Sequence, residues 1–452
     1  MRTANSPLKV VLAVLSLLMT VFLWVQGLQQ SLNRPSFTPQ LSLRQQEISV
    51  LAAPAIPDSL RVLLVGNEPE KNLQKSLEQI SGGIRTERQR ILLASLDQHH
   101  KQRLEILDGN FNDKNLNQYK DLLIASNQNN DSNFYNLKDI KSISDDSLIN
   151  QLVCKQLLGD NRECIDNIES RSMFYRLLFN QVLPIIATLI GSILLINSLW
   201  NIIKNKSYKT QDIQEIPLSI FDMIILIAGG FVVLGEVVLP SLIIPLTTFL
   251  IHDISSPLNE SIKVFIGYCA MSLPPLLIFR QQTKVFRQFQ PPKGGWLQWK
   301  INPPLTSILL ALRGWLMVMP LVLLSGLITN VLVGNQGGSN PLLDLVLKSH
   351  DPISLFILLI TTVILAPLFE EFIFRGILLP VLVNDLGQLF GVSMSALVFA
   401  LAHLSIGELL PLFVLGLGLG VLRLTSGRLL PSVLMHSLWN GITFTNLILL
   451  GG

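Results

Sequence analysis

Apolar residues along this chain fall into long continuous runs rather than short periodic patterns. A helix that crosses a bilayer needs about 20 mostly apolar residues, and runs close to that length recur over most of the sequence. They predict about nine membrane-spanning helices, at residues 10–28, 177–203, 218–251, 262–279, 305–333, 353–383, 389–404, 409–424 and 431–450. The third run contains Pro240 and Pro245, and these prolines predict a break in that helix.

The segment between the first two runs, residues 29–175, has a different composition. It is rich in Asp, Glu, Lys, Arg, Asn and Gln, and contains short amphipathic patterns such as NLQKSLEQI. These features predict a mostly helical domain outside the membrane. The first run is long for the apolar part of a signal peptide, and no small-x-small cleavage site follows it. We therefore interpret it as a retained anchor.

The predicted organisation is an all-α, multispanning membrane protein with an extramembrane domain after its first span. An anchor at 1–28 precedes the domain at 29–175, flanking transmembrane helices occupy 176–350, and a terminal group of helices occupies 351–452. The composition agrees with this class, because 49% of the residues are hydrophobic and only 14% are charged. A net charge of +3, without a basic block interleaved with aromatics, excludes nucleic acid as a partner.

The loops between the runs alternate in charge. Residues 204–209 and 280–300 are basic, whereas HDISSPLNE (252–260) is acidic. By the positive-inside rule, the basic loops and the N-terminus face the cytoplasm or its organellar equivalent, and residues 29–175 lie on the opposite side with the C-terminus. In the polar segment Cys154 and Cys164 lie close together, and their spacing permits a disulfide or two free thiols.

The stretch LFEEFIFRG places three ionisable residues within an apolar run. Each costs about 2.5–3.5 kcal/mol at the centre of a membrane helix, so such residues usually mark function. Glu370 and Glu371 diverge by about a hundred degrees on a helix, and Arg375 lies on the face of Glu371. We expect Glu371 to pair with Arg375, leaving Glu370 to face a cavity as a general base. The alternative is that both glutamates brace helix packing.

Two histidines and an asparagine follow in the same terminal segment. FALAH places His403 on an apolar helix, and HSLWN places His436 and Asn440 on one face of the last helix. A base, imidazoles and an amide can activate a water molecule and stabilise an oxyanion in peptide-bond hydrolysis. The sequence has neither GxSxG nor HExxH. Glu370 and the two histidines could bind zinc, and Glu370 with His403 could equally hold a water without metal.

Helix geometry sets a condition on a shared site. At 1.5 Å per residue counted from residue 353, Glu370 lies about 25 Å from the outer face and therefore near the inner face. His436 also lies near the inner face, whereas His403, counted from residue 389, lies about 20 Å from the inner face. One site requires tilted helices, or a partly interfacial segment at 384–392. Glu236 and Asp222 lie outside these motifs. They could line a water-filled cavity between helices, but a structural hydrogen bond is the role we expect for each.

Three motifs therefore occur in order: EExxxR (Glu370, Glu371, Arg375), FxxxH (Phe399, His403) and HxxxN (His436, Asn440). This set resembles that of the CaaX protease and bacteriocin-processing enzyme (CPBP, or Abi) family, which includes the prenyl-protein Ras-converting protease. The resemblance covers roughly residues 353–450 and implies a multipass intramembrane endopeptidase.

By this resemblance, Glu370 is the base for the catalytic water, supported by Glu371 and Arg375. His403, His436 and Asn440 are the groups that hold water or metal or stabilise the oxyanion. The family has been described both as metalloproteases and as metal-independent glutamate proteases, so zinc on Glu370, His403 and His436 and a metal-free site both stay open.

The expected partners are the lipid bilayer and a membrane-associated protein or peptide substrate, and the sequence makes no prediction of oligomeric state. A competing hypothesis is a membrane scaffold or immunity-type protein that keeps the motifs for folding and acts through residues 29–175. A transporter is less consistent with the sequence, because no inverted repeat is evident and the polar residues cluster in one terminal block.

Overall fold

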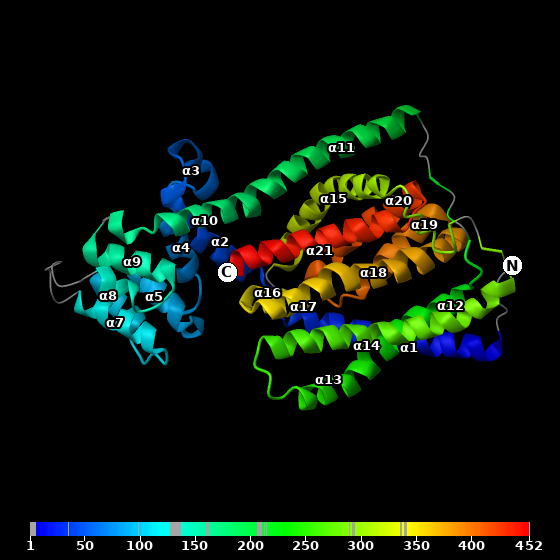
Figure 1. The fold of residues 1–452 in the computed structure, drawn as a ribbon, viewed down its shortest axis with the longest axis horizontal. Coiled ribbons are helices and arrows are strands. Elements are labelled where there is room, and N and C mark those ends of the chain that lie inside the picture. The colour runs from blue at the N-terminus through cyan, green and yellow to red at the C-terminus, as the bar shows by residue number, and fades with distance from the viewer. Residues whose placement is uncertain are drawn as a thin grey trace. The chain divides into compact units, whose positions relative to one another are not determined.

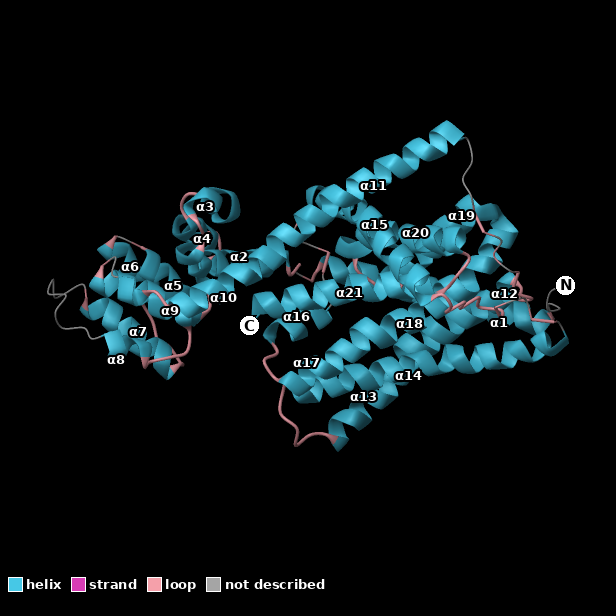
Figure 2. Ribbon diagram, turned by 45° about the horizontal axis from the view of Figure 1, so that its top comes forward, coloured by secondary structure: helices cyan, strands magenta, loops and turns pink. Residues whose placement is uncertain are grey.

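The computed structural model describes residues 6–34, 36–97, 99–126, 137–159, 162–205, 210–211, 213, 215–288, 290–291, 294–334, 337–338 and 341–451. Within these residues the chain is helical, with no strand (Figure 1, Figure 2). Contacts divide the chain into two compact units. We call Met1–Phe37 with Ile185–Gly452 the membrane unit, and Thr38–Pro184 the extramembrane unit.

Eight helical stretches in the described residues are long and apolar enough to cross a membrane. They are Pro7–Leu32, Asn167–Lys204, Ile220–Leu250, Leu258–Gln282, Pro304–Val333, Pro352–Leu401, Ile406–Ser426 and Leu430–Gly451. The number is lower than the predicted nine because the runs at 353–383 and 389–404 count as one stretch, although they are two helices joined by a kink at Gly387. This glycine has non-helical angles, φ 79° and ψ 170°, of a kind that side-chain-bearing residues rarely adopt.

Several of these stretches contain π-helical segments, here η6, η8 and η9. The elements of the membrane unit are α1 (Pro7–Leu32), α11 (Leu183–Asn205, from Ile185), α12 (Ile220–Ile224), η6 (Ile225–Val238), α13 (Leu239–Leu250), α14 (Leu258–Gln282), α15 (Pro304–Val333), α16 (Pro341–Lys348), α17 (Pro352–Leu359), η8 (Ile360–Leu365), α18 (Ala366–Glu371), η9 (Phe372–Leu378), α19 (Leu379–Leu401), α20 (Ile406–Ser426) and α21 (Leu430–Gly451).

The break predicted at Pro240 and Pro245 does not occur. Residues Ile220–Leu250 form one continuous helical stretch, in which π-helical η6 leads directly into α13. Pro240 lies in the first turn of α13, and Pro245 lies inside it. A proline in a membrane helix is tolerated where neighbouring groups satisfy the freed backbone, so this helix crosses without interruption.

Helix α1 packs along the membrane unit from one face to the other. Near its start Lys9 pairs with Asp222 of α12 at 2.8 Å, and farther along the Thr20 hydroxyl donates to the Ala228 carbonyl at 3.1 Å. Near its end Ser31 Oγ accepts from the Ile406 amide at 3.1 Å. Asp222 also caps α12 through Ser219, which confirms the structural role expected for it. The anchor is therefore an integral part of the membrane unit.

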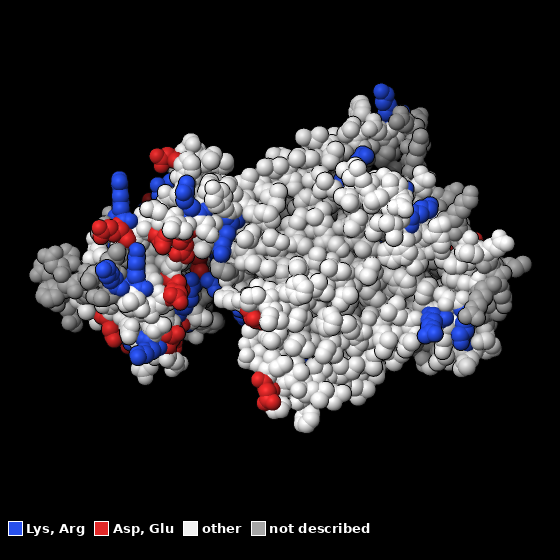
Figure 3. All heavy atoms as spheres, in the orientation of Figure 1, with Lys and Arg blue, Asp and Glu red and all other residues white. Residues whose placement is uncertain are grey.

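Charged side chains are scarce over the middle of the membrane unit. On the face shown in Figure 3, Lys and Arg gather at the end that holds the N-terminus and α12, and acidic residues lie at the other end, near the start of α14. The space between is covered by uncharged residues. This distribution is typical of a protein whose middle contacts hydrocarbon.

The extramembrane unit is a bundle of short helices around a core of Leu, Ile and Ala. Its helices are α2 (Thr38–Ala52), α3 (Asp58–Val65), α4 (Pro69–Glu78), α5 (Glu87–Leu96), α6 (His100–Leu107), α7 (Lys114–Ala125), α8 (Leu137–Lys141), α9 (Ser147–Leu158) and α10 (Asn167–Leu177). Buried Glu47 accepts two hydrogen bonds from Arg88, at 2.8 and 3.1 Å. Burial lowers the pKa of the Arg88 guanidinium, but Glu47 and Asp146 outweigh it, so the pKa lies above its usual value.

Cys154 and Cys164 form a disulfide that joins α9 to the segment before α10. Of the two alternatives that the sequence allowed, free thiols are therefore wrong. Their sequence separation is 10, and closing a loop of that size stabilises a fold by about 2–3 kcal/mol.

Replacing both cysteines by serine is therefore expected to lower the stability of the extramembrane unit by about 2–3 kcal/mol, because the unfolded segment regains its freedom. Thermal unfolding of the full chain measures this change. Reductant is expected to lower the unfolding temperature of the wild type to that of the variant and to leave the unfolding temperature of the variant unchanged. If reductant did not change the unfolding temperature of the wild type, the disulfide would not contribute the expected stability.

Candidate active site

A cavity of about 460 Å³ lies inside the membrane unit. Glu370, His403, His436 and Asn440 all line it, although they come from α18, the turn after α19, and α21. Glu371 and Arg375 do not line it and are fully buried beside it. The three motifs therefore meet at one place, with four of their polar side chains around a cavity and two behind its wall.

Glu371 and Arg375 form the ion pair that their spacing predicted. Arg375 Nη1 donates to Glu371 Oε1 at 2.7 Å, and both side chains are inaccessible to solvent. The same oxygen lies 2.9 Å from His436 Nδ1. Because a carboxylate only accepts, Nδ1 of His436 carries the proton and Nε2 presents a lone pair. Glu371 thus fixes both the orientation and the tautomer of His436.

Glu370 faces the cavity with its two oxygens in different surroundings. Oε1 accepts a hydrogen bond from the Tyr268 hydroxyl of α14 at 3.2 Å. Oε2 is buried and has no hydrogen-bond partner in the described structure, and it lies 3.9 Å from His436 Nε2. A water molecule that donates hydrogen bonds to Glu370 Oε2 and His436 Nε2 would have a carboxylate base on one side and an imidazole lone pair on the other.

Phe399 explains the FxxxH motif. Its ring contacts the imidazoles of His403 and His436, with centroids 4.9 and 5.7 Å apart, and Arg375 Cζ lies 4.3 Å from its centroid. The Phe399 carbonyl lies 2.9 Å from His403 Nδ1. A carbonyl accepts, so Nδ1 of His403 is protonated and its Nε2 is free to accept or to be protonated.

His403 is not on a helix, contrary to the sequence prediction. Helix α19 ends at Leu401, and His403 lies in the turn before α20, where Leu404 has a φ of 50°. The bend at Gly387 begins the second half of α19, and the backbone around Gly391 packs against Val383, so that a Cβ at Gly391 would meet Val383 Cα at 2.7 Å. This tight reversal brings the turn with His403 to the same cavity as Glu370.

Asn440 lines the cavity one turn after His436 on α21. Its amide nitrogen donates one hydrogen bond to the Thr362 carbonyl of η8 at 2.9 Å. An amide carries two N–H donors, so this contact orients the group and leaves a second donor. Such a donor is suited to an oxygen that becomes negative during the reaction.

Zinc at Glu370, His403 and His436 requires three ligand atoms about 2.0–2.2 Å from one ion. In the described residues no group of three or more His, Cys, Asp or Glu side chains is arranged to hold a metal ion. As placed, these side chains do not fit a zinc ion. Zinc stays a prediction from the sequence, which metal analysis of the purified protein tests.

Sequence reasoning missed several residues of the cavity. Glu236 lines the cavity with Glu370, which is the other of the two roles that the sequence allowed and not the structural hydrogen bond that we expected. Its position in an apolar run was the available signal. Tyr268, Arg34 and Glu408 also line the cavity. Tyr268 gave no signal, because a tyrosine in a membrane helix is unremarkable and its contact with Glu370 spans 102 positions.

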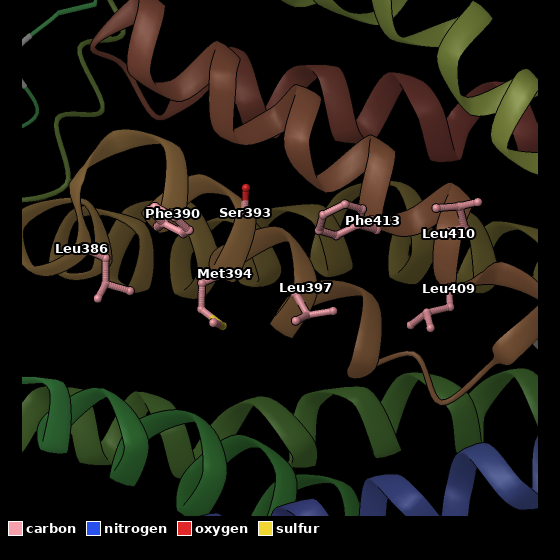
Figure 4. A pocket seen from close by; sticks show the side chains of 8 residues that line it. All are labelled: Leu386, Phe390, Ser393, Met394, Leu397, Leu409, Leu410 and Phe413. Atoms are coloured by element: carbon pink, nitrogen blue, oxygen red, sulfur yellow. The ribbon is translucent and has the colours of Figure 1, made fainter.

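A second cavity of about 580 Å³ lies between the second half of α19 and α20. Its lining is apolar except for one serine: Leu386, Phe390, Ser393, Met394, Leu397, Leu409, Leu410 and Phe413. Figure 4 shows these side chains along the two helices. With no titratable group, this groove cannot supply acid–base chemistry, and the candidate active site is the polar cavity.

Family models match two parts of the chain. Residues 38–175 match a domain of unknown function, DUF8675, and residues 352–442 match the type II CAAX prenyl endopeptidase Rce1-like family. No curated protein and no solved structure matches the chain. The second match extends from α17 into α21 and contains all three motifs. Residues 352–442 are therefore an Rce1-like domain, and this match supports membership of the CPBP family.

Proposed function

We propose that this protein is an intramembrane endopeptidase, which hydrolyses peptide bonds of membrane-associated proteins or peptides with a water molecule activated by Glu370. The observation that carries the proposal is the unpartnered Oε2 of Glu370, buried in a polar cavity 3.9 Å from His436 Nε2. The Rce1-like match supports the same class of activity.

In the proposed reaction Glu370 takes a proton from water as the oxygen attacks the scissile carbonyl. His436 Nε2 accepts a hydrogen bond from the second hydrogen of that water, and this bond orients a lone pair of the water oxygen towards the substrate. The free donor of Asn440, with His403 when its Nε2 is protonated, stabilises the negative charge on the carbonyl oxygen. Glu370 then passes its proton to the leaving amine, so the proton balance closes.

Membrane-protein termini in cells carrying wild type or Glu370→Gln test the proposal. At matched abundance, mass spectrometry is expected to find a set of new termini in the wild type that the variant lacks, because glutamine keeps the shape but cannot take the proton. Those termini identify the substrate. Identical termini with a preserved phenotype would favour a scaffold acting through the extramembrane unit.

Tyr268→Phe is expected to lower kcat by about 10- to 100-fold, with KM changed little. The loss corresponds to one hydrogen bond to a charged group, about 1.5–3 kcal/mol, and the ring contact with Phe369 at 6.1 Å is kept. Hydrolysis of a peptide spanning the identified cleavage site measures it. Tyr175→Phe, at an exposed extramembrane tyrosine, is the matched control. An unchanged kcat in Tyr268→Phe would remove this residue from the site.

A further inference from the structure

The polar cavity extends towards one face of the membrane unit only. On α20 its lining runs from Ser405, just before the helix starts, to Leu415. On α21 it runs from His436 to Leu447, towards the end of the helix at Gly451. Because these two helices run in opposite directions, the lining occupies the start of one and the end of the other. Both lie at the same face, which we call the cavity face.

Several loops meet at the cavity face and help to line the cavity. Arg34 follows the end of α1, and its Nη2 donates to the Leu404 carbonyl at 2.9 Å. The Gly338 amide donates to the Arg34 carbonyl at 3.0 Å, and the Gly407 amide to the Gly337 carbonyl at 3.1 Å. Arg34 and α16, through Leu343, are part of the lining. The outermost wall of the cavity is therefore built where α1 ends and α20 begins.

The opposite face carries basic residues and lies away from the cavity lining. There Lys9 pairs with Asp222, the Gln211 amide donates to the Leu424 carbonyl at 2.9 Å, and Arg428 donates to the Lys300 carbonyl at 3.2 Å. None of these residues lines the cavity. Basic loops at this face indicate the cytoplasmic side of a membrane.

Chain connectivity fixes the side of the membrane on which the chain leaves α1. Helix α1 ends at Leu32 and α2 begins at Thr38. A segment this short spans at most about 20 Å when extended, less than the roughly 30 Å of hydrocarbon. Helix α2 therefore begins on the side of the membrane where Arg34 lies.

The Cys154–Cys164 disulfide identifies the chemistry of that side. Disulfides persist in oxidising compartments and are rare where thiol reductants are present. We propose that the polar cavity opens to the oxidising, extracytoplasmic side of the membrane, and that its substrate is a membrane-attached segment of an exported protein rather than a tail presented from the cytoplasm. The substrate class rests on the proposed function, whereas the direction of opening does not.

Cysteine labelling tests the direction in a Cys269→Ser background. Lys348→Cys lies on α16 at the cavity face, Lys71→Cys on the extramembrane unit, and Gln388→Cys at the bend of α19 on the opposite face; all three positions are exposed. A membrane-impermeant maleimide on intact cells is expected to label the first two fully and the third only after permeabilisation. Lys348→Cys labelled from the same side as Gln388→Cys, or protection of both lysine positions in intact cells, would overturn the proposal.

The termini lost in Glu370→Gln cells test the substrate class separately. Cleavage sites in extracytoplasmic or lumen-facing segments of exported proteins are the expected result. Sites in cytoplasmic tails would overturn it. No lost termini together with the expected labelling would reject the proposed function and the substrate class but leave the direction of opening established, because labelling does not depend on activity.

Discussion

Glu370→Gln is expected to lower the rate of peptide hydrolysis by about 10²–10⁴-fold, the usual contribution of a general base. Glutamine keeps the size of the side chain and accepts the hydrogen bond from Tyr268 through its amide oxygen. It cannot take a proton from water. Single-turnover hydrolysis by purified protein, with the peptide identified from cellular termini, measures the effect.

Glu236→Gln is the matched control, because Glu236 is a second carboxylate in the same cavity. Its carboxylate lies close enough to Glu370 for the two charges to interact, but in the described residues it makes no hydrogen bond to the three motifs. We expect its replacement to change the rate by less than about 10-fold, well below the general-base effect. Equal losses in both variants would indicate that total charge in the cavity, rather than Glu370 itself, determines the rate. A fully active Glu370→Gln would contradict the mechanism.

Arg375→Leu is expected to destabilise the membrane unit by about 3–5 kcal/mol. Its guanidinium and the Glu371 carboxylate are both inaccessible to solvent and 2.7 Å apart. Without Arg375, the buried Glu371 carboxylate keeps only its hydrogen bond from His436, and a buried charge without its ion partner costs several kcal/mol. Thermal unfolding in detergent, followed by loss of monodisperse protein, measures the change.

The double variant Glu371→Leu with Arg375→Leu separates the ion pair from packing. Removing both charges avoids the unpaired group, so the double variant is expected to be less destabilised than the sum of the two single variants, by at least about 1 kcal/mol. It is still expected to lose activity, because His436 Nδ1 loses the carboxylate that orients it. Additive stability changes would show that the pair is not coupled.

The sequence was most informative where one helix holds both partners. Glu371 and Arg375 are four residues apart, so their ion pair follows from helix geometry alone. The divergence of Glu370 from Glu371 likewise predicted that one carboxylate faces a cavity while the other is paired. The long apolar runs located the membrane helices for the same reason, because the length of a run is a local property of the sequence that can be compared directly with the thickness of a bilayer.

Features that depend on tertiary packing could not be read in this way. His403 was placed on a helix, because apolar residues precede it and no proline or glycine marks the end of α19. The bend at Gly387 joins two predicted spans, yet an isolated glycine in an apolar run does not specify its angles. The contacts of Phe399 with two imidazoles and a guanidinium, and of Tyr268 with Glu370, connect helices far apart in sequence.

In the proposed mechanism, water activated by Glu370 attacks the peptide bond directly. Single-turnover cleavage by the wild type in ¹⁸O-labelled water with hydroxylamine present, beside Glu370→Gln, tests this step. We expect one ¹⁸O atom in each new carboxyl terminus, no hydroxamate, and no product from the variant on the same time scale. Hydroxamate would reveal a covalent acyl intermediate, and product from Glu370→Gln at the wild-type rate would show that Glu370 is not the base.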